Sequence, residues 1–158
     1  GNFFVMKAVG AAAEAGADLD EVVRIGEKVN AATRTMGVAL SSCIPPAKGT
    51  PLFEIAEDEM EIGVGIHGEP GRRRAKIGTA DEIVDELLHA IVPDLPFTSG
   101  DEVALMVNGL GGTPISELYI LYGTAHSRLD GQGITVGRSY VGEYCTALDM
   151  AGASITLV

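Results

Sequence analysis

Apolar residues recur at helical spacing in the first part of the chain and predict two helices. Residues 3–15 are apolar and rich in alanine, and Gly16 follows them as a typical helix stop. Asp18 and Glu21 have the spacing of a capping box, which predicts that a second helix begins there. Apolar residues continue at helical spacing, so we expect this helix to run to about Thr35.

Two further helices are predicted in the second half of the chain. Thr79 and Glu82 again have the capping-box spacing. The wide apolar stripe that follows consists of Ala80, Ile83, Val84, Leu87, Leu88 and Ile91. For the last helix, Thr113 is expected as the N-cap and Pro114 as the first helical residue. Its expected apolar face consists of Ile115, Leu118, Tyr122, Ala125 and Leu129.

Shorter segments between the helices have the patterns of strands. The expected strands are residues 38–44, 59–66, 103–107 and 134–141, and residues 145–158 suggest a hairpin. Because residues 103–107 are apolar without interruption, we expect them inside the sheet with both faces covered. Strands that alternate with helices define an α/β protein. We therefore predict a single layered α/β/α domain over residues 1–158, with a mixed β-sheet and a C-terminal β-hairpin.

His67 follows the second predicted strand and is the strongest candidate for chemistry. Side chains alternate along a strand, so Gly63, Gly65 and His67 are expected on one face. Glycine inside a strand often marks the close approach of a ligand. An imidazole there can act as a nucleophile, a general base or a metal ligand. A hydrogen-bonded structural histidine beside a tight turn is the alternative. The metal role is disfavoured because no second His or Cys lies nearby in sequence.

The composition narrows the class of partner. The 158 residues carry a formal net charge of −11, which disfavours nucleic acid and an anionic membrane but suits a small neutral substrate. Cys43 and Cys145 fit no metal-binding pattern, so we expect buried thiols in the reducing cytoplasm. We find neither a signal peptide nor a membrane-length apolar run, which favours a cytoplasmic protein. The chain opens at Gly1 without an initiator Met, so we expect a piece of a longer protein.

Two other motifs could bind phosphate, but a structural role is favoured for both. Arg72, Arg73 and Arg74 form a basic cluster, and pairing with the acids at residues 57–59 is the favoured interpretation. Residues 109–114 are a glycine-rich loop before a helix. This loop lacks the P-loop and dinucleotide fingerprints. A tight strand-to-helix turn is therefore favoured, with contact to a partner subunit as the second choice.

Residues 58–74, which include the stretch GVGIHGEPGRRR, resemble the segment around the substrate histidine of dihydroxyacetone kinases. Three other segments are similar to the same family, namely residues 36–43, 108–114 and 149–157. The resemblance covers essentially the whole chain and is to the substrate-binding K subunit. It implies that residues 1–158 are the C-terminal half of a K subunit that has two α/β domains.

The resemblance implies a covalent role for His67. It implies that this histidine adds to the ketone carbonyl as a hemiaminal, which holds the terminal hydroxyl in place for phosphoryl transfer. An ordinary imidazole, with a pKa of about 6.5, is mostly neutral at pH 7 and is therefore a competent nucleophile. The implied substrate is dihydroxyacetone (glycerone). A kinase component for another short ketose such as erythrulose, or a ketone-sensing co-regulator without catalysis, remains an alternative.

The resemblance also places the phosphoryl donor outside this chain. It implies ATP with Mg²⁺, or a tightly bound ADP that a phosphotransferase relay recharges, on a separate L subunit or domain. It further implies a homodimer, no cofactor or metal in this chain, and an acid/base Asp on the N-terminal half of the K subunit. We therefore expect a component of a kinase that has no turnover as this half alone.

Overall fold

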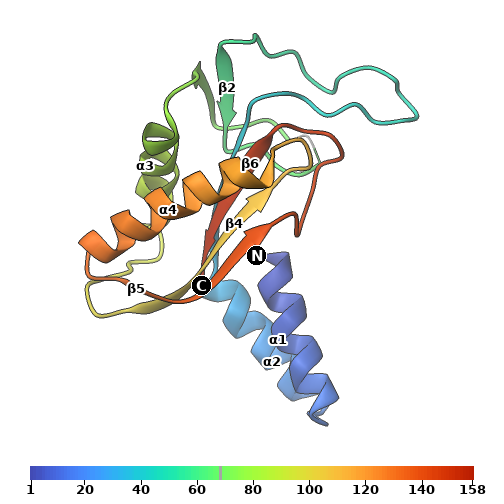
Figure 1. The fold of residues 1–158 in the computed structure, drawn as a ribbon. Coiled ribbons are helices and arrows are strands. Elements are labelled where there is room, and N and C mark those ends of the chain that lie inside the picture. Colours follow the sequence, from blue (N-terminus) through green and yellow to red (C-terminus); the bar gives the residue numbers. More distant parts are fainter. Residues whose placement is uncertain (68) are drawn as a thin grey trace.

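The computed structural model describes residues 1–67 and 69–158 (Figure 1). Its helices are α1 (Asn2–Glu14), α2 (Leu19–Ala31), α3 (Ala80–Ile91) and α4 (Ile115–Gly131). Its strands are β1 (Arg34–Ala39), β2 (Glu59–Ile62), β3 (Arg73–Lys76), β4 (Glu102–Gly109), β5 (Thr135–Gly142) and β6 (Gly152–Leu157). No helix in the two described ranges is both long and apolar enough to cross a lipid bilayer.

These strands form one sheet in the order β3-β2-β1-β6-β4-β5. β4 and β5 are parallel and are joined through α4, because parallel neighbours need a long crossover connection. The other neighbouring pairs are antiparallel. β6 lies between β1 and β4, so that Ile155 pairs with Met36 on one side and with Val107 on the other. The predicted α/β class and mixed sheet are confirmed.

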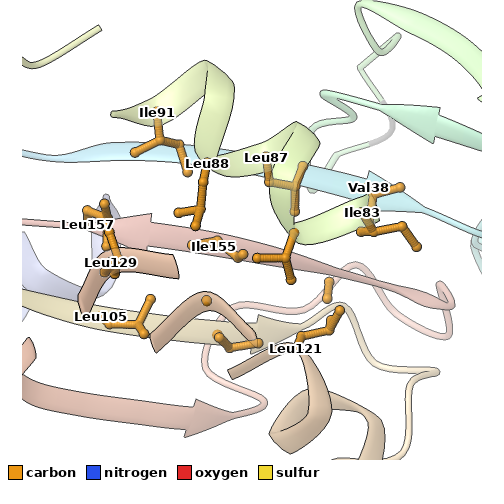
Figure 2. Close-up of a cluster of buried hydrophobic side chains, with 14 of the residues drawn as sticks. Val38, Ile83, Leu87, Leu88, Ile91, Leu105, Leu121, Leu129, Ile155 and Leu157 are labelled. Atoms are coloured by element: carbon orange, nitrogen blue, oxygen red, sulfur yellow. The ribbon is translucent and has the colours of Figure 1, made fainter. Parts of the chain in front are cut away.

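Helices α3 and α4 pack together over one face of the sheet and enclose the main core (Figure 2). Five of the six predicted stripe positions of α3 are buried, and both bonds of the capping box between Thr79 and Glu82 are present. Figure 2 shows Leu87 and Leu88 of α3 lying over Ile155 of β6. The apolar stripe therefore fixes α3 on the sheet, as its spacing predicts.

Helix α4 buries a slightly different face from the predicted one. Ile115 is exposed, and Leu121 joins the buried face in its place. Pro114 stands at the N-cap and the helix begins at Ile115. Thr113 does not cap the helix, because its hydroxyl accepts a hydrogen bond from the N–H of Gly152 and donates one to the carbonyl of the same residue. This side chain therefore joins the start of α4 to β6.

Helices α1 and α2 pair with each other and project from one end of the sheet (Figure 1). Asp18 caps α2 as predicted, by accepting a hydrogen bond from the N–H of Glu21. The first turn of α1 reaches the strands, where the ring of Phe4 packs edge-on against Tyr140 at a centroid distance of 5.5 Å. Neither helix covers the face of the sheet opposite α3 and α4. The described part of the chain therefore has two layers rather than the predicted three.

The predicted C-terminal hairpin is wrong. Residues 143–151 connect two strands that are not neighbours, and β6 pairs with β1 and β4. The turn-like residues 149–152 lead the chain into the middle of the sheet, where the N–H of Leu40 donates to the carbonyl of Ala151. Alternating apolar residues identified the strand itself, but its partners are distant in sequence.

Two other strand predictions differ from the structure, and one strand was missed. Helix α2 ends at Ala31 and β1 begins at Arg34, four residues before the predicted start. β2 ends at Ile62 and not at residue 66. β3 was not predicted, because it lacks the apolar alternation that identifies a strand. Two of its three basic side chains, Arg74 and Lys76, lie opposite acidic ones of β2. Arg74, for example, pairs in register with Glu61.

Candidate functional site

His67 lies in the turn that follows β2 and lines a pocket of about 420 Å³. The His67 side chain is 78% exposed. The other lining residues are Cys43, Pro45, Leu52, Ile66, Thr146, Ala147 and Leu148. They come from the loops that follow β1, β2 and β5, and most of their side chains are apolar. The imidazole is therefore the main polar side chain that a small ligand would meet in this pocket.

The glycines before His67 shape a turn and do not clear a strand face. Because β2 ends at Ile62, the prediction that Gly63, Gly65 and His67 share one strand face is wrong. Gly63 has a φ of +83°, which residues with a side chain rarely adopt. A Cβ atom on Gly65 would overlap the carboxylate of Glu69. The glycines therefore shape the turn that contains His67, for a different physical reason from the predicted one.

Glu69 is the direct partner of His67 in this turn. Its Oε1 lies 2.8 Å from the ring Nδ1 of His67, and its Oε2 accepts a hydrogen bond of 2.9 Å from the His67 backbone N–H. The hydrogen bond to the imidazole is the main cause that lowers the pKa of the Glu69 carboxyl. The Nε2 atom has no hydrogen-bond partner among residues 1–67 and 69–158. Sequence reasoning missed Glu69, although an acid two residues from a candidate nucleophile was a usable signal.

A second, smaller core supports the floor of the pocket. Its buried members are Ala39, Cys43, Val64, Leu110, Ala147 and Met150, with Phe53 and Ile66 packed against them. Three of these residues, Cys43, Ile66 and Ala147, also line the pocket. The loops that surround His67 are therefore held by apolar burial below the ligand space. Cys43 is buried as predicted, Cys145 is half-buried, and both are free thiols.

Asp149 connects two walls of the pocket. Its carboxylate accepts a hydrogen bond of 2.9 Å from the backbone N–H of Ile44, which lies beside the pocket residues Cys43 and Pro45. Tyr144 lies away from the pocket in an aromatic cluster around the start of α1, where its ring centroid is 4.7 Å from that of Phe3. Neither role could be assigned from the sequence, because both depend on contacts between residues more than 100 positions apart.

The basic cluster pairs with acids, as the favoured interpretation predicts, but its partners mostly differ from those expected. Arg74 binds Glu61 at 3.0 Å and lies 3.7 Å from Glu59. Arg73 binds Glu86 of α3 at 2.8 Å. The side chain of Arg72 lies over Gly63. Two of the three arginines are thus neutralised locally, which disfavours a phosphate site there.

The glycine-rich loop 109–114 is a tight turn in which two backbone N–H groups already have partners in the protein. The N–H of Leu110 donates to the carbonyl of Gly152, and that of Gly112 donates to the carbonyl of Met150. A Cβ on Gly111 would overlap the carbonyl oxygen of Leu148. Because the loop packs against residues 147–152, it does not fit a nucleotide phosphate.

No group of three His, Cys, Asp or Glu side chains in the described ranges could hold a metal ion. His89 is exposed on α3, as expected. His126 is half-buried on α4, with its ring 5.8 Å from that of Tyr122. Neither of them is close to the pocket in the fold, so His67 is the histidine that lines it.

Comparison with known proteins identifies the family. The Dak1 domain family matches residues 1–158, so the chain belongs to this family. The chain is 45% identical over its full length to the dihydroxyacetone-binding subunit of a PTS-dependent dihydroxyacetone kinase from Listeria innocua, and covers 48% of that protein. It is equally 45% identical to an L-erythrulose 1-kinase from Mycolicibacterium smegmatis and covers 28% of it. The chain thus spans half or less of the length of these relatives.

Solved structures confirm the fold and the resemblance to dihydroxyacetone kinases. A dihydroxyacetone kinase operon co-activator, DhaQ, superimposes with a TM-score of 0.91 at 33% identity, over 98% of this chain and 48% of its own. The dihydroxyacetone kinase of C. freundii, solved with AMP-PNP and Mg²⁺, superimposes with a TM-score of 0.82 at 32% identity, over 99% of this chain and 28% of its own. The family therefore includes kinase components and a co-activator on one fold.

Proposed function

We propose that this chain is the C-terminal half of a dihydroxyacetone-binding kinase subunit, in which His67 binds the ketone covalently. One observation carries the proposal: the His67 ring is exposed at an apolar pocket, and its Nε2 atom has no partner among the described residues. The role named for the Listeria relative, dihydroxyacetone binding, supports the identity of the ligand.

The proposed step is an addition that conserves all atoms. The lone pair of Nε2 attacks the carbonyl carbon, an Nε2–C bond forms, and the π bond of the carbonyl breaks. The carbonyl oxygen takes up a proton and becomes a hydroxyl, while the ring loses one, so the hemiaminal is neutral. Glycerol lacks a carbonyl and cannot react, so the site selects a ketone by its reactivity. The adduct fixes the terminal hydroxyl for phosphoryl transfer.

The phosphoryl donor in this proposal lies on another domain or subunit. The loop 109–114 does not fit a phosphate, and the pocket has no basic side chain apart from the imidazole. We therefore propose that ATP with Mg²⁺, or a recharged ADP, is bound by an L partner, and that this half has no turnover alone. A homodimer in the cytoplasm completes the proposed assembly.

Two related functions are favoured by specific relatives. Erythrulose kinases are as similar to this chain as the dihydroxyacetone-binding subunits are, and the same histidine chemistry would serve either short ketose. The high TM-score to a co-activator favours a ketone sensor without catalysis. An L subunit that co-purifies with the intact protein supports the kinase, whereas a transcription regulator in its place supports the sensor.

Carbon-13 NMR of dihydroxyacetone labelled at its carbonyl carbon tests the covalent step. With the intact protein we expect the labelled carbon to change from a trigonal to a tetrahedral signal, which titrates with protein and is absent with His67→Asn. His89→Asn, an exposed histidine on α3, is the matched control and should leave the signal unchanged. A trigonal carbon in the bound state would refute the hemiaminal.

A further inference from the structure

The turn after β2 folds the carboxylate of Glu69 back onto the residue two positions before it. Both oxygens bind His67, one at the backbone N–H at 2.9 Å and the other at the ring Nδ1 at 2.8 Å. The backbone of Gly65 closes the same turn, because its N–H donates to the Glu69 carbonyl at 3.3 Å. Glu69 therefore holds the ring of His67 with one carboxylate oxygen, while its other oxygen binds the backbone of the same residue.

This arrangement dictates where the imidazole proton resides. An ionised carboxylate can only accept hydrogen bonds, so the ring nitrogen that faces it must carry a hydrogen. In a neutral imidazole the other nitrogen then has the lone pair. The hydrogen bond from His67 lowers the pKa of Glu69 below its usual 4.5, so the acceptor is ionised at neutral pH. The lone pair is therefore assigned to Nε2, the atom without a partner in the described residues.

The glycine at position 65 gives a second, independent sign that the turn is built around this carboxylate. A Cβ atom on Gly65 would overlap Oε2 of Glu69, the oxygen that accepts the His67 N–H. Any larger residue would displace the carboxylate or the turn. Glycine is thus required at position 65 because a side chain there would displace the Glu69 carboxylate, and not because of a positive φ.

We infer that Glu69 is the positioning residue of the site: it fixes His67 as the Nδ1–H tautomer, which leaves Nε2 as the nucleophile. This inference rests on the proposed covalent role of His67. As Nε2 attacks a carbonyl, positive charge develops on the ring, and the adjacent carboxylate stabilises it. Glu69 would therefore increase the population of the reactive tautomer, stabilise the charge that develops during the attack, and accept the Nδ1 proton that the ring gives up as the neutral hemiaminal forms.

Glu69→Gln is the sharpest test, because the amide has one acceptor and one donor. The backbone N–H of His67 must take the amide oxygen, so the amide NH₂ faces Nδ1 and favours a lone pair there. The variant should thus move the proton to Nε2 with almost no change of shape. Glu57→Gln is the matched control, since Glu57 is exposed and its side chain makes no hydrogen bond with the described residues.

Nitrogen-15 NMR of the three histidines, with His67 assigned from His67→Asn, measures the tautomer without any ketone. We expect an Nδ1–H ring in the wild-type protein and in Glu57→Gln, and a shift to the Nε2–H form in Glu69→Gln. Gly65→Ala should lose the Nδ1–H preference as well. In the intact protein, the adduct signal should weaken by about 10-fold or more in Glu69→Gln, because the reactive tautomer becomes the minor form.

An unchanged tautomer and an unchanged adduct in Glu69→Gln would overturn the inference. The two readouts also separate it from the proposed function. If wild-type protein shows the Nδ1–H tautomer but no adduct with any short ketose, the covalent function fails while the positioning role of Glu69 stands. If the adduct forms but Glu69→Gln changes neither readout, the positioning role fails alone.

Discussion

The side chain of Asn108 holds the backbone of Cys145 at both of its polar groups. Its Oδ1 accepts a hydrogen bond of 2.8 Å from the Cys145 N–H, and its Nδ2 donates one of 2.9 Å to the Cys145 carbonyl. The same Oδ1 accepts from the N–H of Tyr144. Asn108 is buried at the end of β4. One amide thus fixes the start of the loop that continues into the pocket at Thr146.

Asn108→Ala should therefore destabilise the protein by about 2–4 kcal/mol, because it leaves several partly buried backbone groups without partners. The free energy of unfolding in urea measures the loss. Amide hydrogen exchange gives the location, and the N–H groups of Tyr144 and Cys145 should exchange much faster. Asn30→Ala, on the exposed side of α2, should change stability by less than about 0.5 kcal/mol. Unchanged exchange at Tyr144 and Cys145 would contradict the anchoring role.

Gly111 is the position where the loop before α4 tolerates no side chain. Its φ is +116°, and a Cβ would overlap the carbonyl oxygen of Leu148, which lines the His67 pocket. Gly111→Ala should cost at least about 2 kcal/mol in the free energy of unfolding. Gly123→Ala is the opposite case, since nothing lies within 4 Å of its Cβ position in the middle of α4. It should stabilise the protein by about 0.5–1 kcal/mol. Equal effects of the two substitutions would refute this account.

Local signals predicted the elements of the fold well. The capping boxes and apolar stripes located the helices because both depend on residues three or four positions apart, and Thr79 with Glu82 shows this directly. Strand partners could not be predicted in the same way. β6 pairs with β1 across more than 100 residues, and the alternation within residues 145–158 has no information about a distant partner.

The candidate site could be proposed only in part from the sequence. His67 was singled out because glycines cluster around it, yet those glycines shape a turn and leave room for the Glu69 carboxylate rather than clear a strand face. The roles of Asn108 and Asp149 could not be predicted from the sequence. Each side chain binds a backbone segment that is distant in sequence and lies close to it only in the folded protein. Resemblance to dihydroxyacetone kinases supplied the proposed ketone chemistry, because the residues alone left the role of His67 open among a nucleophile, a base and a metal ligand.

The packing of α3 on the sheet predicts a large effect at Leu87. Its side chain is fully buried between the helix and the strands (Figure 2). Leu87→Ala should lower the free energy of unfolding by about 2–5 kcal/mol, through lost burial and the cavity that remains. Leu19→Ala removes the same atoms from an exposed position on α2 and should cost less than about 0.5 kcal/mol. Urea denaturation of both variants measures the contrast, and a loss below about 1 kcal/mol at Leu87 would contradict the described core.

The ion pair between Asp85 of α3 and Arg128 of α4 predicts a small, pH-dependent contribution to stability. Arg128 Nε lies 2.7 Å from the Asp85 carboxylate, and this hydrogen bond lowers the pKa of Asp85 below its usual 3.8. A carboxyl whose pKa is lower in the folded state stabilises the protein above its unfolded pKa, and this contribution is lost as the pH falls through the folded pKa. At pH 7, Asp85→Asn should therefore lower Tm by about 1–3 °C, because the pair is exposed. The difference between wild type and variant should hold down to about pH 5 and shrink below pH 3.8. Added salt should reduce this difference in Tm at every pH.

The double variant is the control for this ion pair. In the background of Arg128→Gln, Asp85→Asn should have almost no effect on Tm. A full effect in that background would show that Asp85 acts through another partner.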